Sequence, residues 1–277
     1  MNPPGTGPAW AIVLAAGGGT RFGGPKQFED LAGLPMLEHP VRAAAAVCDG
    51  IVVVVPPGYL PPSATGGSAH SPDRFGRVGY LPPSATGGSA HSPDRFGRVG
   101  YLQTWTPPAG VRLAVGGASR ADSVRAGLAA VPPEAAVIVV TDAAHPLATP
   151  ALYRRVVDAV RAGAGAAVPG LPLTEVVKEI TVGQPTGTGP GPVVAGASLP
   201  RETHRMIQTP HAFAAAELRA AHAGAEQAVE DSAMVAARGV RVVVVDGEPT
   251  NIHVTTPAEL AMARQLAGAV LTDGGVR

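Results

Sequence analysis

A glycine-rich segment near the N-terminus holds the residues best suited to chemistry. Residues 14–27 read LAAGGGTRFGGPKQ, so three consecutive glycines precede one cation at Arg21 and a second at Lys26. Glycines let backbone N–H groups close around phosphate oxygens, and flanking cations neutralise phosphate charge. The segment lacks the Gly-Lys-Ser/Thr of a Walker A loop and does not complete the G-x-G-x-x-G pattern of dinucleotide-binding proteins. It therefore predicts a phosphate-binding loop of another kind.

Short apolar runs, the first of which leads directly into this loop, recur along the chain. They predict buried strands over residues 11–14, 51–55, 111–115, 137–141, 166–168, 176–180 and 240–245. Ala-rich stretches between them predict helices over about 36–47, 119–130, 150–162, 212–223, 230–238 and 256–269. Alternating strands and helices indicate an α/β fold with a mostly parallel sheet, whose ligands bind beyond the carboxyl ends of the strands.

One acidic residue lies at such a strand end. Asp142 directly follows the run 137–141, and this place favours a functional carboxylate over a solvent-facing turn residue. Its carboxylate could hold a substrate hydroxyl or help to bind a metal ion.

The composition excludes several classes of protein. The 277 residues include 21 basic and 21 acidic side chains, so the formal net charge is zero and general nucleic-acid binding is disfavoured. The lone Cys48 can form neither an intramolecular disulfide nor a thiolate zinc site, which fits a reducing cytoplasm. The apolar stretch 9–16 is far shorter than the roughly 20 residues of a membrane span. We expect a cytoplasmic protein with no membrane or nucleic-acid partner.

The chain contains one perfect internal repeat. Residues 58–78 recur unchanged as residues 79–99. Two copies are too few for a solenoid, and the repeat is rich in Pro, Gly and Ser without apolar periodicity. It is interpreted as a duplicated surface loop, because long loop insertions cost little stability.

Several motifs together resemble a known family. The segment 14–27 is similar to the signature of sugar-phosphate nucleotidylyltransferases, and the chain most resembles their 2-C-methyl-D-erythritol 4-phosphate cytidylyltransferase branch. Further matching segments are GGASRADSV at 116–124, DAAHP at 142–146, QTP at 208–210 and the NI and VT pairs within 251–255. The resemblance spans residues 10–270 apart from the duplicated loop.

The resemblance implies a fold and a division of the chain. The fold is a single Rossmann-like three-layer sandwich with a mostly parallel sheet and a protruding dimerisation arm, formed here by about residues 171–205. Without one repeat copy the chain has 277 − 21 = 256 residues, close to the size of one such domain. The expected parts are an N-terminal tail at 1–8, the domain at 9–270 with the duplicated loop at 58–99, and a C-terminal tail at 271–277.

The resemblance also implies a reaction and the residues that bind the nucleotide. A substrate phosphate attacks the α-phosphorus of CTP, pyrophosphate leaves, and Mg²⁺ bridges the nucleotide phosphates, with Asp142 as a possible ligand. Arg21 and Lys26 match the family's catalytic cations. The residues that match its nucleotide site are Ala15, Ala16, Gly17, Gly19, Gly117 and Ser123.

The acceptor side departs from the family pattern. The residues expected to bind the polyol phosphate are Asp142, His145, Arg201, Thr209 and His253, with Arg201 reaching into the neighbouring subunit of a homodimer. The family usually has Arg at the position of His145 and Lys at that of His253. Val176 replaces a Thr and Thr250 replaces an Asp. Histidine has an ordinary pKa near 6.5, so it binds phosphate more weakly than a permanent cation at neutral pH.

These departures leave three explanations open. The first is a methylerythritol phosphate enzyme with an altered acceptor pocket. The second is a cytidylyltransferase for another polyol phosphate or a phosphonate. The third is a catalytically weak paralogue that binds nucleotide, and the intact Arg21, Lys26, Asp142 and Arg201 argue against it. A zinc site at His145 and His253 is conceivable, although two histidines without a third ligand more often line a polar pocket.

Overall fold

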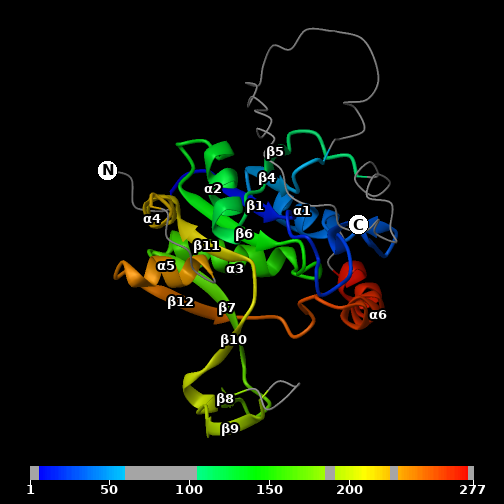
Figure 1. The fold of residues 1–277 in the computed structure, drawn as a ribbon. Coiled ribbons are helices and arrows are strands. Elements are labelled where there is room, and N and C mark those ends of the chain that lie inside the picture. The colour runs from blue at the N-terminus through cyan, green and yellow to red at the C-terminus, as the bar shows by residue number, and fades with distance from the viewer. Residues whose placement is uncertain (1–5, 60–104, 185–190, 225–229, 274–277) are drawn as a thin grey trace, which may run out of the picture.

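The computed structural model describes four segments of the chain, residues 6–59, 105–184, 191–224 and 230–273 (Figure 1). The expected N-terminal tail up to residue 5, the duplicated loop beyond Tyr59 and the last four residues lie outside them.

The central strands contain continuous apolar runs because both faces of the sheet are covered. In β1 (Ala9–Leu14), Ala11 and Val13 pack into one hydrophobic cluster and Ile12 packs into another. Residues 51–55 of β4 (Gly50–Val55) and residues 137–140 of β6 (Val137–Asp142) alternate between the same two clusters. Successive strand residues point to opposite faces, so a strand buried on both sides is a continuous apolar run.

These strands belong to an eight-stranded sheet. Its order is β10 (Arg205–Ile207), β7 (Ala166–Pro172), β11 (His211–Ala214), β6, β1, β4 and β5 (Arg112–Val115), and β12 (Val242–Asp246) pairs with β7. Only β10 and β11 pair with their neighbours in the antiparallel direction. The expectation of a mostly parallel sheet is confirmed.

Helices cover both faces of the sheet, which makes three layers (Figure 1). Buried residues of α1 (Glu38–Ala45) and α3 (Pro150–Arg161) belong to one cluster. Those of α2 (Arg120–Ala130), α4 (Ala215–Ala221) and α5 (Asp231–Ala237) belong to the other. The last helix, α6 (Pro257–Asp273), packs on a small hairpin of β2 (Asp30–Leu31) and β3 (Leu34–Pro35). Within the described segments, no helix combines the length and apolarity needed to cross a bilayer.

An arm projects from the sheet beyond β7 and β10 (Figure 1). It consists of β8 (Lys178–Val182) and β9 (Val193–Ser198), which form a separate antiparallel pair. Every residue of both strands is exposed. The chain returns from the arm through a short 3-10 helix at Arg201–Thr203.

The residues that flank the undescribed segment 60–104 contact each other. The Tyr59 hydroxyl donates a hydrogen bond of 2.6 Å to the Trp105 carbonyl, and the two ring centroids are 6.2 Å apart. The Trp105 indole N–H donates in turn to Glu38 of α1. Both side chains are buried, so this clasp joins the two ends of the segment at the edge of the core.

Some sequence-based expectations are wrong at the level of single elements. The helix predicted at 212–223 begins as strand β11, because Phe213 is fully buried between β6 and β7 and pairing with these strands outweighs the helix propensity of alanine. The strand predicted at 176–180 occupies 178–182, and β2, β3, β9 and β10 were not predicted. Helix α6 continues to Asp273, so the first residues of the expected C-terminal tail are helical.

Candidate functional site

A cavity of about 470 Å³ opens at the carboxyl ends of β1 and β6. Three chain segments supply most of its wall, namely 14–22 with 26–27, 117–120 with Ser123, and 142–144. His253 and Thr255, from the loop before α6, complete it. The predicted phosphate-binding loop and Asp142 thus meet where the α/β pattern places a ligand.

The glycine loop has positive φ at Gly19 and Gly23, and Gly19 is also closely packed. Gly19 has φ of 64°, and a Cβ added there would lie 1.7 Å from the Gly24 carbonyl oxygen. The Gly19 carbonyl accepts hydrogen bonds from the backbone N–H groups of residues 22–24, which turns the chain back. Gln27 fixes the base of the loop, since its buried Nε2 donates to the Ala15 carbonyl at 2.8 Å. Gly17 and Gly18 are exposed and leave the loop open towards the cavity.

The first turn of α2 forms the opposite wall. Ser119 caps the helix through a capping box with Asp122, and the buried Ser123 hydroxyl donates to the Ser119 carbonyl at 3.0 Å. A Cβ at Gly116 would lie 2.3 Å from the Ala16 Cβ, so glycine is needed for this wall to approach the loop closely. The positive end of the α2 dipole therefore borders the cavity and favours an anion there.

The two predicted cations differ in how they are held. Arg21 is exposed, whereas Lys26 is partly buried and its ammonium donates a hydrogen bond to the Val254 carbonyl. Burial lowers the pKa of Lys26 and the nearby Arg21 lowers it further, while Asp142 and Glu259 oppose the change. The bond to Val254 ties the glycine loop to the loop that carries His253.

Asp142 has a basic neighbour that the sequence analysis did not single out. Arg120, the first residue of α2, lines the cavity and its Nε lies 3.9 Å from Asp142 Oδ1. On the other side, the Asp142 N–H donates a long hydrogen bond of 3.4 Å to the hydroxyl of the buried Thr209. The sequence feature that could have identified Arg120 is its position in the SRADS motif, between Gly117 and Ser123, which match the family's nucleotide site.

The two histidines that depart from the family pattern form a stacked pair. Their ring centroids are 4.5 Å apart with an interplanar angle of 13°. His253 lines the cavity, and His145 lies buried behind it with its Nδ1 lacking a hydrogen-bond partner. Burial lowers the pKa of His145 to about 3, with smaller contributions from His253, His211 and Lys26. Burial, then Lys26, also lowers the pKa of His253. Both rings are therefore neutral at neutral pH.

The loop that carries His253 is anchored to a distant motif. Gln208 Nε2 donates to the Asn251 carbonyl at 2.9 Å, and Asn251 Nδ2 donates to the Thr209 carbonyl at 2.8 Å. These buried bonds hold the QTP and NI segments side by side although they are about 40 residues apart in sequence.

The cavity gathers most, but not all, of the predicted site residues. Those that line it are Ala15, Ala16, Gly17, Gly19, Arg21, Lys26, Gly117, Ser123, Asp142 and His253. His145 and Thr209 lie just behind this wall. Arg201 is exposed in the 3-10 helix beyond the arm and is not part of the wall. Among the described residues, no group of three or more His, Cys, Asp or Glu side chains could hold a metal ion, so nothing supports a zinc site at the histidine pair.

A glycine loop with two cations at the end of a parallel strand, facing a helix N-terminus and an aspartate, defines a nucleotidyltransferase site. Two family models match the chain. The MobA-like NTP transferase domain matches residues 11–74, and the 2-C-methyl-D-erythritol 4-phosphate cytidylyltransferase model matches residues 90–268. The break between the two matches falls inside the duplicated segment.

Individual relatives agree with the second model. A 2-C-methyl-D-erythritol 4-phosphate cytidylyltransferase of Streptomyces coelicolor is 38% identical over 95% of this chain and 87% of its own length. The enzyme of that name from Rhodococcus jostii is 35% identical over 95% of this chain and 96% of its own. The crystal structure of the enzyme of that name from Thermus thermophilus has a TM-score of 0.61 and 29% identity, covering 93% of this chain and 98% of that one. The chain belongs to the 2-C-methyl-D-erythritol 4-phosphate cytidylyltransferase family.

The geometry of the glycine loop leads to a first prediction. Gly19→Ala would place a side chain at positive φ against the Gly24 carbonyl, so the loop must rearrange. We expect binding of CTP, the nucleotide that the resemblance implies, to weaken about tenfold or more in titration calorimetry.

The matched control is Gly24→Ala. Gly24 lies in the same loop but has no positive φ, and a Cβ there would meet nothing within 4 Å. An equal loss of binding in both variants would mean that added bulk, and not loop geometry, is responsible.

Proposed function

We propose that this chain transfers CMP from CTP to 2-C-methyl-D-erythritol 4-phosphate, in the synthesis of isoprenoid precursors by the non-mevalonate route. A phosphate oxygen of the acceptor forms a bond to the α-phosphorus of CTP, the bond to the bridging oxygen breaks, and pyrophosphate leaves. The observation that carries this proposal is the cavity, where the glycine loop, two cations and the first turn of α2 face one another. The single cysteine and membership of this family support a cytoplasmic location.

In this proposal the nucleotide lies between the glycine loop and α2. The backbone of Ala15, Ala16 and Gly17 reads the cytosine together with Gly117 and Ser123, because small residues let a base approach the main chain. The exposed Gly17 and Gly18 present their N–H groups to the phosphates. Arg21 and Lys26 neutralise the charge that spreads over the phosphoryl oxygens as the bond breaks.

Mg²⁺ fits this cavity as an ion carried in by the triphosphate. Asp142 is the only carboxylate among the residues that line the cavity, and Mg²⁺ commonly binds one or two carboxylates together with substrate phosphates. When bound, the ion would neutralise phosphate charge and orient the pyrophosphate leaving group. Asp142 would hold it, while Arg120 limits the net negative charge beside it.

The acceptor would enter beside Asp142 and His253, with Thr209 and His145 supporting them from behind. Because both histidines are neutral, this side of the cavity provides hydrogen-bonding groups where the family usually has cations. That observation favours one alternative, a cytidylyltransferase for another polyol phosphate or a phosphonate. The intact Arg21, Lys26 and Asp142 argue against the third explanation, a paralogue without turnover.

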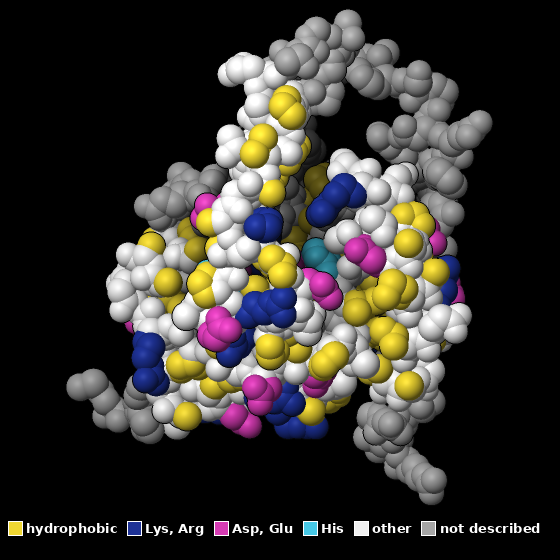
Figure 2. Space-filling view, turned by 90° about the horizontal axis from the view of Figure 1, so that it is seen from below, with side chains coloured by type: hydrophobic (Ala, Val, Ile, Leu, Met, Phe, Trp, Pro, Cys, Tyr) yellow, Lys and Arg dark blue, Asp and Glu magenta, His cyan; other side chains and the backbone are white. Residues whose placement is uncertain are grey.

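The arm supports a homodimer. Its apolar residues Ile180, Val182, Val193 and Val194 are each between 58% and 64% exposed. A lone two-stranded hairpin is only marginally stable in water, and contiguous exposed apolar surface marks an interface. The space-filling view from below shows such side chains along the projecting arm (Figure 2). A second copy that covers the arm would bring the partner subunit's Arg201 to the acceptor phosphate.

The proposed reaction predicts pyrophosphate release from CTP and Mg²⁺ only when a suitable acceptor is present. We expect release with methylerythritol phosphate, measured by a coupled pyrophosphate assay beside ribitol phosphate and small phosphonates. Lys26→Met should lower kcat/KM by about 10² to 10³ because it removes a cation from the transition state. Arg154→Met, which removes an exposed cation from α3, is the control. Release with none of the acceptors would refute the reaction, and selective release with another acceptor would refute the isoprenoid substrate.

The neutral histidine pair predicts that a restored cation improves acceptor binding. His253→Lys should lower the KM for methylerythritol phosphate about fivefold and leave the KM for CTP unchanged, as one partly exposed ion pair contributes about 1 kcal/mol. Met262→Lys adds the same charge at an exposed position of α6 and should change neither value. An unchanged acceptor KM in His253→Lys would show that His253 does not face the acceptor phosphate.

The arm predicts a dimer in solution that depends on its apolar strands. Light scattering after size exclusion should give twice the chain mass for the native protein. Ile180→Glu with Val193→Glu should give a folded monomer, because two carboxylates would have to be buried without partners. Met262→Glu, on an exposed part of α6, should remain dimeric. A monomeric native protein would contradict the proposed dimer.

A further inference from the structure

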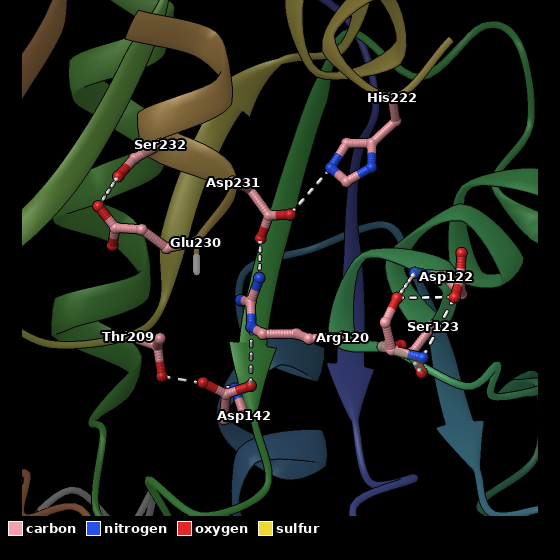
Figure 3. Close-up of polar contacts among 10 residues, drawn as sticks. Arg120, Asp122, Ser123, Asp142, Thr209, His222, Glu230, Asp231 and Ser232 are labelled. Carbon is pink, nitrogen blue, oxygen red and sulfur yellow. Dashed lines mark hydrogen bonds and ion pairs between the residues drawn. The ribbon is translucent and has the colours of Figure 1, made fainter. Parts of the chain in front are cut away.

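Arg120 is held from behind by a buried carboxylate. Its Nη1 donates a hydrogen bond of 2.6 Å to Asp231 Oδ2, and the Asp231 side chain is 1% exposed. Asp231 begins α5 and lies 111 residues further along the chain. Figure 3 shows the guanidinium between Asp231 on one side and Asp142, at the end of β6, on the other.

Asp231 has a second buried partner. His222, at the end of α4, brings its Nε2 to 2.9 Å from Asp231 Oδ1, and both side chains are 1% exposed. Burial alone would raise the pKa of Asp231, but the hydrogen bonds from His222 and Arg120 together with their charges hold it below its usual value. Asp231 is therefore ionised at neutral pH.

The guanidinium is shared unequally between two carboxylates. The bond to Asp231 is 2.6 Å, whereas Arg120 Nε lies 3.9 Å from Asp142 Oδ1. The capping box of Ser119 and Asp122 already fixes the start of α2, so the helix does not need Arg120 to form. A buried ion pair adds little net stability, because the charges must be desolvated. Holding the guanidinium in place is the better account of this arrangement.

We propose that Asp231, supported by His222, is a positioning residue that fixes the Arg120 guanidinium at the wall of the nucleotide cavity. This inference rests on the proposed function, because it takes CTP as the ligand of the cavity. Without the Asp231 bond, the side chain is free to close on Asp142 or to turn to solvent. Either movement would carry the positive charge of Arg120 away from the place where the phosphates and the metal ion bind.

A double-mutant cycle tests the proposal through equilibrium binding of CTP with Mg²⁺, without acceptor. We expect Asp231→Asn to raise the dissociation constant about tenfold and Arg120→Met to raise it by a similar factor. The double variant should be no weaker than Arg120→Met, because Asp231 acts only through Arg120. Effects that multiply in the double variant would overturn the proposal.

Glu230→Gln is the matched control. It removes one negative charge from the neighbouring residue, whose carboxylate accepts a hydrogen bond from Ser232 and not from Arg120. We expect CTP binding to change less than about twofold. His222→Asn keeps the Asp231 charge and removes its second bond, so it should raise the dissociation constant about threefold. This variant decides the question if Asp231→Asn does not fold, and unchanged binding in it would count against the proposal.

A readout without nucleotide separates this proposal from the proposed function. The Nη1–H group of Arg120 donates to Asp231, and its signal is assigned by its loss in Arg120→Met. This signal should exchange slowly in the native protein and rapidly in Asp231→Asn. Slow exchange in Asp231→Asn would overturn the positioning role even if CTP binds. If the native protein binds no CTP, the proposed function fails, and the exchange rates still decide whether Asp231 holds Arg120.

Discussion

The in-register pairing of β1 with β6 is the constraint on which the site depends. Leu14 and Asp142 are partners across the two strands, so the glycine loop and the aspartate leave the sheet at the same level. The backbone continues this pairing past the strand ends, since the Ala143 N–H donates to the Leu14 carbonyl at 2.9 Å. A slip of one residue would turn every side chain of the strand to the other face, and two hydrophobic clusters prevent it. The packing of the core therefore fixes the positions of the glycine loop and Asp142 relative to each other.

The remaining parts of the site are attached to this edge by long-range polar bonds. Lys26 donates to the carbonyl of Val254, and Asn251 donates to that of Thr209, so the loop before α6 is held both to the glycine loop and to the connection between β10 and β11. Arg120 is bound in a similar way to Asp231. Each contact joins segments far apart in sequence and leaves a charged or polar group facing the cavity. The wall is consequently a set of separate segments, each fixed by one or two buried or partly buried hydrogen bonds.

The sequence predicts what is encoded locally. The strand followed by glycines and cations, the α/β alternation and Asp142 at a strand end follow from short-range patterns, because buried strands must be apolar and a phosphate loop needs glycine. Most other site residues follow from the family resemblance. Three features could not be found in this way. The Arg120–Asp231 bond spans 111 residues, and β11 is a strand only because β6 and β7 lie beside it. The neutrality of His145 results from burial, which no single-residue pattern reveals. In each case the deciding partner is remote in sequence.

The clasp between Tyr59 and Trp105 lets the chain accept inserted residues between these two positions. The hydroxyl-to-carbonyl bond and the adjacent rings join the two ends of the segment where the repeat occurs. Chain inserted beyond the clasp does not alter the distance between β4 and β5, and doubling a loop adds only about 0.6 kcal/mol of closure cost. A copying event of 21 residues at this place is therefore nearly neutral for folding. The same insertion between β1 and Lys26 would separate the cations from the strand that positions them, whereas residues added beyond the clasp leave the site unchanged.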